Sequence, residues 1–196
     1  MADNKGGFMS LNEFVLALVS IVIGLGMTDL LTSFHRLLRA GAAVKWDWLT
    51  LFYAALMLYT QIAFWWWQFG YPNTSSLTIA EFLLNFVFLA ISFLMVASAL
   101  PDEIPVDGID LREFYVVSLR HRWSLVTVSL LLNVAVNLWS DITAGRADWI
   151  MGLFPAVGAV FAASAIKIRA TWFQALTIVW IFGVTLHSTL FRAIGP

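Results

Sequence analysis

The strongest constraint on this chain is a series of six apolar stretches, each about as long as a helix that crosses a membrane. A spanning helix needs about 20 mostly apolar residues. The segments between the stretches are short and rich in Pro, Gly, Asp and Asn, so no soluble domain fits between them. We therefore expect an all-α protein with one integral membrane domain, residues 1–196, folded as a six-helix transmembrane bundle. The expected spans are residues 12–33, 47–69, 78–100, 122–140, 147–166 and 171–193.

The composition agrees with a lipid-embedded protein. Hydrophobic residues make up 61% of the chain and charged residues 12%, whereas soluble domains are about half apolar and a quarter charged. The net charge of −1 provides no electrostatic attraction for nucleic acid, so we expect no nucleic-acid partner. There are no cysteines, which excludes disulfides, thiolate metal sites and cysteine nucleophiles.

Lysine and arginine are divided unequally between the two sides of the predicted bundle. Positive residues concentrate in cytoplasmic loops. The side that holds both termini carries three of them, Lys5, Arg146 and Arg192, and the other side carries eight. We therefore expect both termini to lie outside the cytoplasm. The eight residues of the cytoplasmic side are Arg36, Arg39, Lys45, Arg112, Arg120, Arg122, Lys167 and Arg169.

Tryptophans mark the same boundaries independently, because Trp is enriched at both membrane interfaces. Nine of the ten tryptophans fall near the predicted ends of spans. The run of three that closes the second span fans around the helix, since successive residues are about 100° apart, and so does not form one flat stacking face. The expected anchors at the outer interface are Trp65, Trp66, Trp67, Trp139 and Trp149.

Polar residues inside the spans are spaced as on single helix faces, with residues four apart in the third and fourth spans. Two readings are open. They either join helices through hydrogen bonds, or they line a polar cavity in the outer half of the membrane, with Glu81 and His187 as proton or cation groups. The residues expected to line such a cavity are Gln61, Glu81, Asn85, Asn133, Asn137 and His187.

Asp29 lies near the cytoplasmic end of the first span, and Arg36 follows seven residues later on roughly the same helix face. The pair is expected either to form a structural ion pair or to act at the inner mouth of an ion pathway.

Small residues at three- or four-residue spacing predict close helix packing in two spans. The first span has Ala17, Ser20 and Gly24, and the fifth has Gly158 and Ala162. The fifth span is expected at a tight interface, either in the centre of the bundle or between protomers.

The longest connection, between the third and fourth spans, contains a helix signal. Asp110 is a good N-cap, and Glu113 stands three residues later as in a capping box. An apolar side with arginines beside it predicts a short amphipathic helix on the cytoplasmic membrane surface, separate from the fourth span. A docking site for a partner is the alternative reading.

Two segments, "FVLALVSIVIGLGMTDLLTSFHRLLRA" and "DLREFYVVSLRHRW", resemble a group of short, uncharacterised bacterial six-span inner-membrane proteins. The resemblance covers the whole chain. It implies a multi-pass protein of a bacterial inner membrane, and it implies no activity.

No nucleotide-binding, metalloprotease or serine-hydrolase motif is present, so we expect no enzymatic activity and no cofactor or metal. The leading hypothesis is a small channel or transporter with a polar outer vestibule. The alternative is a non-catalytic accessory or assembly subunit that uses the fifth span and the cytoplasmic helix as contact surfaces. The expected partners are the lipid bilayer and either further copies of the chain or another membrane protein.

Overall fold

The computed structural model describes residues 11–69, 78–143 and 149–190. Within these ranges the chain forms six α-helices and two very short strands, which confirms the all-α prediction. A single 3-10 turn, η1 (Gly41–Ala43), joins the first helix to the first strand. The helices are α1 (Leu11–Ala40), α2 (Trp48–Phe69), α3 (Ile79–Ala97), α4 (Leu111–Thr143), α5 (Trp149–Ala165) and α6 (Thr171–Leu190), and the strands are β1 (Val44–Lys45) and β2 (Ile109–Asp110).

Five helices, α1, α2, α3, α4 and α6, are long and apolar enough to cross a membrane. α5 is also apolar but has only 17 residues, which at 1.5 Å per residue gives about 26 Å, slightly less than a bilayer core of about 30 Å. The protein is therefore a multi-pass membrane bundle.

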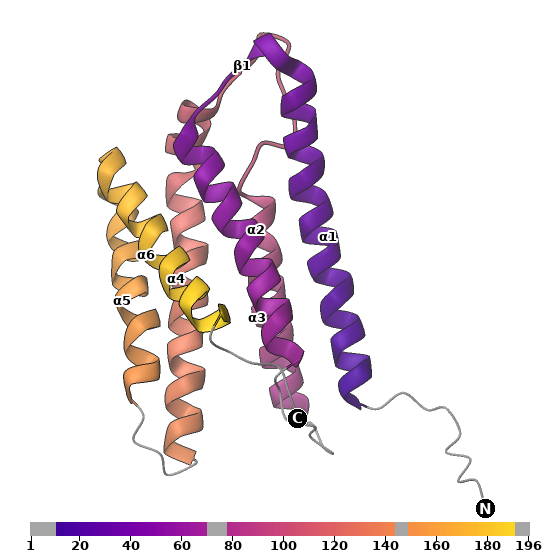
Figure 1. The fold of residues 1–196 in the computed structure, drawn as a ribbon, viewed down its shortest axis with the longest axis vertical. Helices are drawn as coiled ribbons and strands as arrows, with labels where there is room; N and C mark the ends of the chain where they lie inside the picture. The colour runs from indigo at the N-terminus through magenta and orange to yellow at the C-terminus, as the bar shows by residue number, and fades with distance from the viewer. Residues whose placement is uncertain (1–10, 70–77, 144–148, 191–196) are drawn as a thin grey trace, which may run out of the picture.

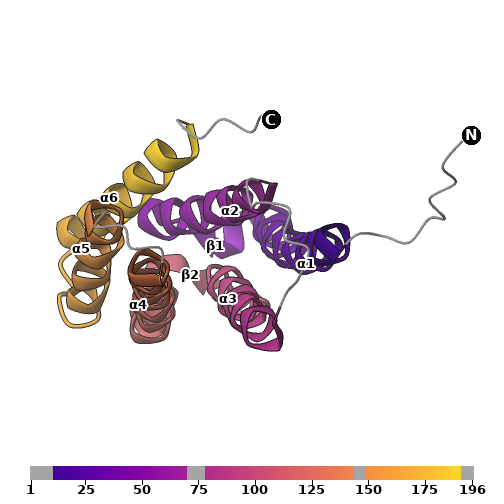
Figure 2. The same cartoon turned by 90° about the horizontal axis from the view of Figure 1, so that it is seen from below.

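The helices form two layers of three, with α1, α2 and α6 facing α3, α4 and α5 (Figure 2). The closest neighbours are α4 with α5, α1 with α3, and α2 with α6. The paired strands lie at one end of the bundle, which we call the strand end, and the other end is the far end (Figure 1). The eight basic residues of the predicted cytoplasmic side lie in the last two turns of α1, in β1, in the first half of α4 and in the connection between α5 and α6. Each of these segments begins, ends or reverses direction at the strand end.

The two connections at the strand end are tied together by a parallel strand pair. Val44 lies opposite Ile109, and Lys45 lies opposite Asp110. The chain enters β2 through Gly108, whose φ of 87° favours glycine. A Cβ atom on Gly108 would lie 2.4 Å from the carbonyl oxygen of Ala43, so a side chain has no room there.

The prediction of a separate surface helix before the fourth span was wrong. α4 is one helix of 33 residues that includes both segments. Asp110 does cap it, because its Oδ1 accepts hydrogen bonds from the backbone nitrogens of Arg112 (2.9 Å) and Glu113 (3.2 Å). The apolar side of the first turns is buried inside the bundle, and the same stripe continues into the span at helical spacing. The buried residues of this stripe are Leu111, Tyr115, Leu119, Trp123 and Val126.

We expect Gly108→Ala to lower the melting temperature of the detergent-solubilised protein, because it adds both left-handed strain of about 1–2 kcal/mol and a backbone clash. Gly41→Ala is the matched control. Gly41 also has a positive φ, of 50°, but no atom lies within 4 Å of a Cβ built there. An equal effect of the two substitutions would contradict the close approach of Gly108 to Ala43.

Candidate functional site

The most connected polar group in the described structure is the buried side chain of Gln174, near the start of α6. Its Oε1 accepts hydrogen bonds from the hydroxyl of Tyr115 (3.0 Å) and from Nε1 of Trp123 (2.5 Å), both on α4. Its Nε2 donates to the carbonyl oxygen of Ala165 (2.9 Å), the last residue of α5, and to that of Ile168 (2.6 Å), in the connection to α6. A single amide therefore joins three helices. It satisfies one carbonyl that the last turn of α5 leaves open and one in the connection that follows.

Arg122 of α4 is fully buried beside this group. Its Nε donates to the carbonyl oxygen of Ser98 (2.9 Å) and its Nη2 to that of Ala99 (3.1 Å), where α3 ends. Helix C-termini carry a partial negative charge, which favours a cation at this position. Among the residues that the structure describes, the two ion pairs are Lys45–Asp110 and Arg112–Asp47, so Arg122 has no carboxylate partner there.

Aromatic rings enclose the Arg122 guanidinium. Its central carbon lies 4.6 Å from the ring centre of Phe114, 5.1 Å from that of Tyr115 and 5.3 Å from that of Tyr53. These distances are typical of cation–π contacts. Tyr53, on α2, also meets Tyr115 and Trp123 edge to face, with centroids 6.1 and 5.7 Å apart. The rings therefore extend the contact of α4 to α2.

We call these five residues, Tyr53, Tyr115, Arg122, Trp123 and Gln174, the strand-end node. None is more than 1% exposed, so they fill the centre of the bundle where α2, α4 and α6 meet. The node holds neither a carboxylate nor a histidine, and the described residues contain no cluster of three or more His, Cys, Asp or Glu that suits a metal ion. The contacts of the node therefore hold the helices of the bundle together.

Sequence reasoning missed the node. The basic residues before the fourth span predict Arg122 at the membrane surface, and no sequence pattern predicts a role for Gln174. The available signal was the spacing of Tyr115 and Trp123, eight residues apart on one side of α4, together with a lone glutamine in an apolar span.

Four of the six predicted cavity residues bond locally or to a single neighbouring helix. Gln61 is buried, and its Nε2 donates to the carbonyl oxygen (2.9 Å) and the hydroxyl (2.6 Å) of Ser92 on α3. Glu81 is exposed and completes a capping box with Thr78 at the start of α3. The side-chain nitrogen of Asn137 donates to the carbonyl oxygen (2.8 Å) and Oδ1 (2.9 Å) of Asn133, one turn earlier in α4. The described contacts of these side chains therefore stabilise individual helices and the α2–α3 pair.

Of the remaining predicted cavity residues, Asn85 is half-buried on α3 and His187 is exposed near the end of α6. At the strand end, Nη1 of Arg36 donates to the carbonyl oxygen of Asp102 (2.7 Å), while Asp29 is half-buried about two turns earlier in α1. Arg36 and Asp102 border a hollow of about 490 Å³ together with Glu103 and Ile104.

The small residues of the fifth span contact neighbours within the chain. Ala162 is fully buried. A Cβ on Gly158 would lie 3.4 Å from Leu130 of α4 and 3.9 Å from Trp180 of α6. In α1 the pattern differs, because no atom lies within 4 Å of a Cβ built on Gly24. Ala17 is half-buried one turn before Ser20.

The tryptophans expected at the outer interface divide into two groups. Trp66 is 37% exposed and Trp139 is 72% exposed, as an interfacial residue can be. Trp65 instead turns towards α1, where its Nε1 donates to Oγ of Ser20 (3.0 Å). Trp67 is half-buried, and Trp149 begins α5 with its side chain outside the described part of the structure.

Comparison of the chain with protein-family models, with curated proteins and with solved structures gave no match. The findings therefore support a helical protein with five long apolar helices, and the resemblance to uncharacterised inner-membrane proteins stays a prediction.

We expect Gln174→Leu to destabilise the protein by at least about 3 kcal/mol, because it leaves two buried donors and two carbonyls without partners. Thermal unfolding in detergent, followed by circular dichroism, measures this as a drop of roughly 10 °C. Gln61→Leu serves as the control, since it removes bonds to Ser92 alone and is expected to cost less. Equal melting temperatures for the two variants would contradict the role of Gln174.

Proposed function

We propose that the protein is a non-catalytic accessory subunit of a membrane assembly and does not conduct a solute through its own bundle. The strand-end node is the observation that supports this proposal most. A pathway through the centre of the bundle would have to pass Arg122, Trp123 and Gln174, which are at most 1% exposed. Opening such a pathway would break the hydrogen bonds that join α4 to the end of α3, α4 to α6, and α6 to α5.

The polar residues expected to line a vestibule give this proposal further support. The side chains of Gln61, Glu81 and Asn137 already have partners on their own or an adjacent helix. Intramembrane amides and hydroxyls bonded in this way contribute about 0.6–2 kcal/mol each to helix association. Their presence in the spans is thus accounted for without a transported species.

The contact surfaces first expected for a partner are in part occupied within the chain. Span five packs between α4 and α6, and the start of α4 is buried in the bundle. A membrane partner would instead meet the lipid-exposed sides of the helices. Representative exposed residues on four of them are Leu25, Leu83, Val160 and Val179. In keeping with the resemblance and the basic strand end, we assign the protein to a bacterial inner membrane with the strand end in the cytoplasm.

A channel or transporter is the second candidate, favoured by Asn133 and Asn137. Both are half-buried on the side of α4 that continues the buried stripe of Val126, so they give the bundle a polar side in its far-end half. This candidate requires the strand-end node to open during transport.

Vesicles reconstituted with the purified protein should show ion and proton fluxes equal to those of protein-free vesicles across a range of pH and voltage. A flux above this background that falls in Asn137→Ala would support the channel instead and contradict the proposed function.

In cells, a photo-crosslinking residue placed at Leu25, Leu83, Val160 or Val179 should yield an adduct with one discrete membrane protein, and the assembly of that protein should fail when this chain is deleted. The same residue at the buried Leu56 is the control and should yield none. Adducts at none of the exposed positions, or a partner that assembles normally in the deletion strain, would contradict an accessory role.

A further inference from the structure

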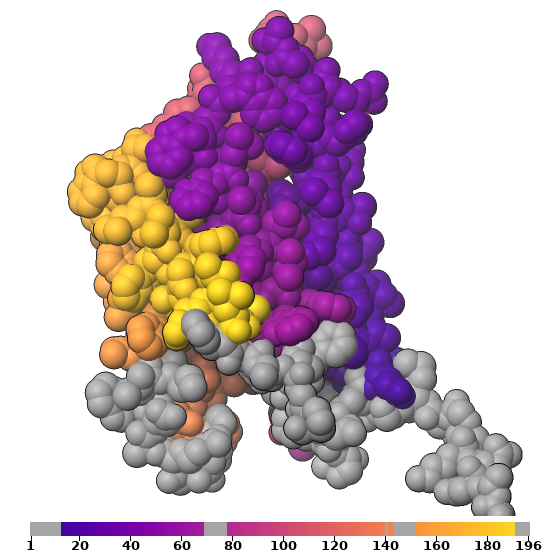
Figure 3. Space-filling model, viewed as in Figure 1, coloured from indigo at the N-terminus to yellow at the C-terminus, as the bar shows by residue number. Residues whose placement is uncertain are grey.

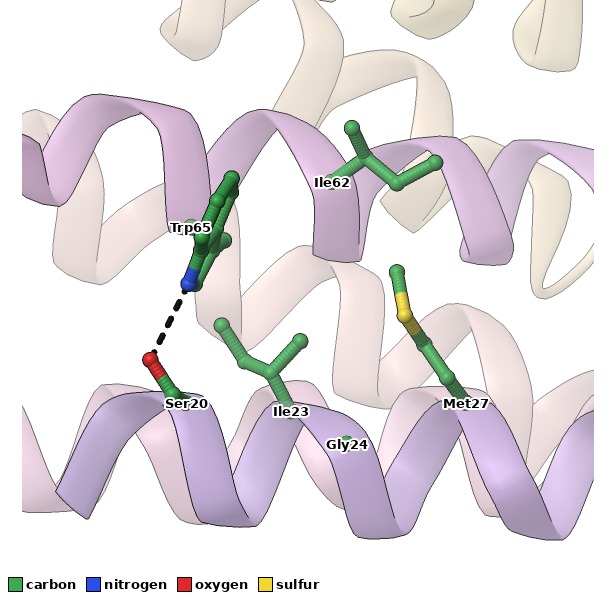
Figure 4. A pocket seen from close by; sticks show the side chains of 6 residues that line it. All are labelled: Ser20, Ile23, Gly24, Met27, Ile62 and Trp65. Atoms are coloured by element: carbon green, nitrogen blue, oxygen red, sulfur yellow. Dashed lines mark hydrogen bonds between the residues drawn. The ribbon is translucent and has the colours of Figure 1, made fainter. Parts of the chain in front are cut away.

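An apolar groove lies between α1 and α2, in the middle of the predicted first span (Figure 4). Its volume is about 320 Å³. Ser20, Ile23, Gly24 and Met27 of α1 form one wall, and Ile62 and Trp65 of α2 form the other. The empty space next to Gly24 belongs to this groove, because no atom of the described chain lies within 4 Å of a Cβ built there.

The two polar side chains of the groove already have partners. Nε1 of Trp65 donates to Oγ of Ser20 (3.0 Å), and this hydroxyl donates in turn to the carbonyl oxygen of Leu16 (2.7 Å). The other side chains that line the groove are aliphatic or sulfur-containing. An occupant therefore needs no polar group, and an apolar one gains the most from burial here.

The dimensions of the groove favour a hydrocarbon chain over a helix. From Ser20 to Met27 the helix axis rises about 10 Å, so the 320 Å³ of the groove correspond to a cross-section of about 30 Å². A helix with its side chains is at least about 10 Å wide, which corresponds to a cross-section of about 80 Å². Hydrocarbon chains in contact lie about 4–4.5 Å apart, so each chain has a cross-section of about 20 Å² and fits the groove.

One arginine and one histidine are placed where the head group of such a lipid would lie. His35 and Arg39 follow Gly24 by 11 and 15 residues, which turns them about 20° and 60° from it and raises them about 17 and 23 Å along α1. Half of a bilayer measures about 15 Å to the edge of the hydrocarbon and about 20–22 Å with its head groups. Both side chains are exposed at the strand end and form no ion pair within the described residues.

We propose that the groove between α1 and α2 binds one acyl chain of a phospholipid whose anionic phosphate head group contacts His35 and Arg39. The site is independent of the proposed accessory function, because it uses the seam between two helices of the same chain. Gly24 keeps the groove open, Trp65 and Ser20 bound it towards the far end, and the charge of Arg39 selects an anionic head group, which His35 contacts through a hydrogen bond.

The test is lipid retention by the full-length protein, measured by native mass spectrometry after incubation in detergent with phosphatidylglycerol or phosphatidylcholine. The wild-type protein should retain one phosphatidylglycerol. Gly24→Leu should lower this retention at least fivefold by filling the groove, and Ile62→Trp should do the same from the α2 side. Leu25→Phe is the matched control, because Leu25 is 58% exposed and does not line the groove, and it should retain lipid like the wild type.

The head group is tested separately by Arg39→Gln, which should remove the preference for phosphatidylglycerol over phosphatidylcholine while chain binding persists. Arg36→Gln is the control, because Arg36 is bonded to Asp102. Unchanged retention in folded Gly24→Leu and Ile62→Trp proteins would overturn the acyl-chain site. Loss of folding in Gly24→Leu would overturn it too, since the space beside Gly24 would then be filled in the native protein. No preference for phosphatidylglycerol in the wild type would overturn the anionic head group.

Discussion

The arrangement of this bundle depends on the buried guanidinium of Arg122, which has no carboxylate partner among the described residues. Removing an unpaired charge from water costs several kcal/mol, so the surroundings of Arg122 must supply compensating interactions. The end of α3 supplies two carbonyls with the partial negative charge of a helix C-terminus, and three aromatic rings supply their electron-rich faces. Arg122 thereby fixes the end of α3 against α4 and α2, and Gln174 adds α5 and α6.

This concentration of polar contacts at one end has consequences for the rest of the molecule. The strand end is closed by side chains that have no access to solvent, which argues against transport through a single bundle. α1 lies at the edge of its layer (Figure 1). Its glycines Gly24 and Gly26 lie on nearly opposite sides of the helix. Gly26 faces Phe93 and Val96 of α3, whereas Gly24 faces the open groove next to α2. In the space-filling view of Figure 3, α1 forms one side of the molecule. The groove is thus a place where close packing stops.

Much of the fold followed from the lengths of the apolar stretches, because a bilayer sets a length that short helices do not meet. The cap at Asp110 was also predictable, since it depends on neighbouring residues only. The continuity of α4 was not, because charged residues at Arg120 and Arg122 are typical of a membrane surface, and their burial depends on partners far away in sequence. The same limit applies to the groove between α1 and α2. The spacing puts Gly24 and Gly26 in one short motif, but only tertiary packing decides that the space beside Gly26 is filled and the space beside Gly24 is open.

The most direct test of this account is the accessibility of the end of α3 when Arg122 is removed. The chain has no cysteines, so Val96→Cys introduces a single thiol at a fully buried position of similar size. In detergent, adding Arg122→Met should speed maleimide labelling of this thiol at least tenfold and lower the melting temperature, because two carbonyls lose their donors. A double variant that is labelled at the rate of Val96→Cys alone, and is equally stable, would contradict the claim that Arg122 holds the bundle together.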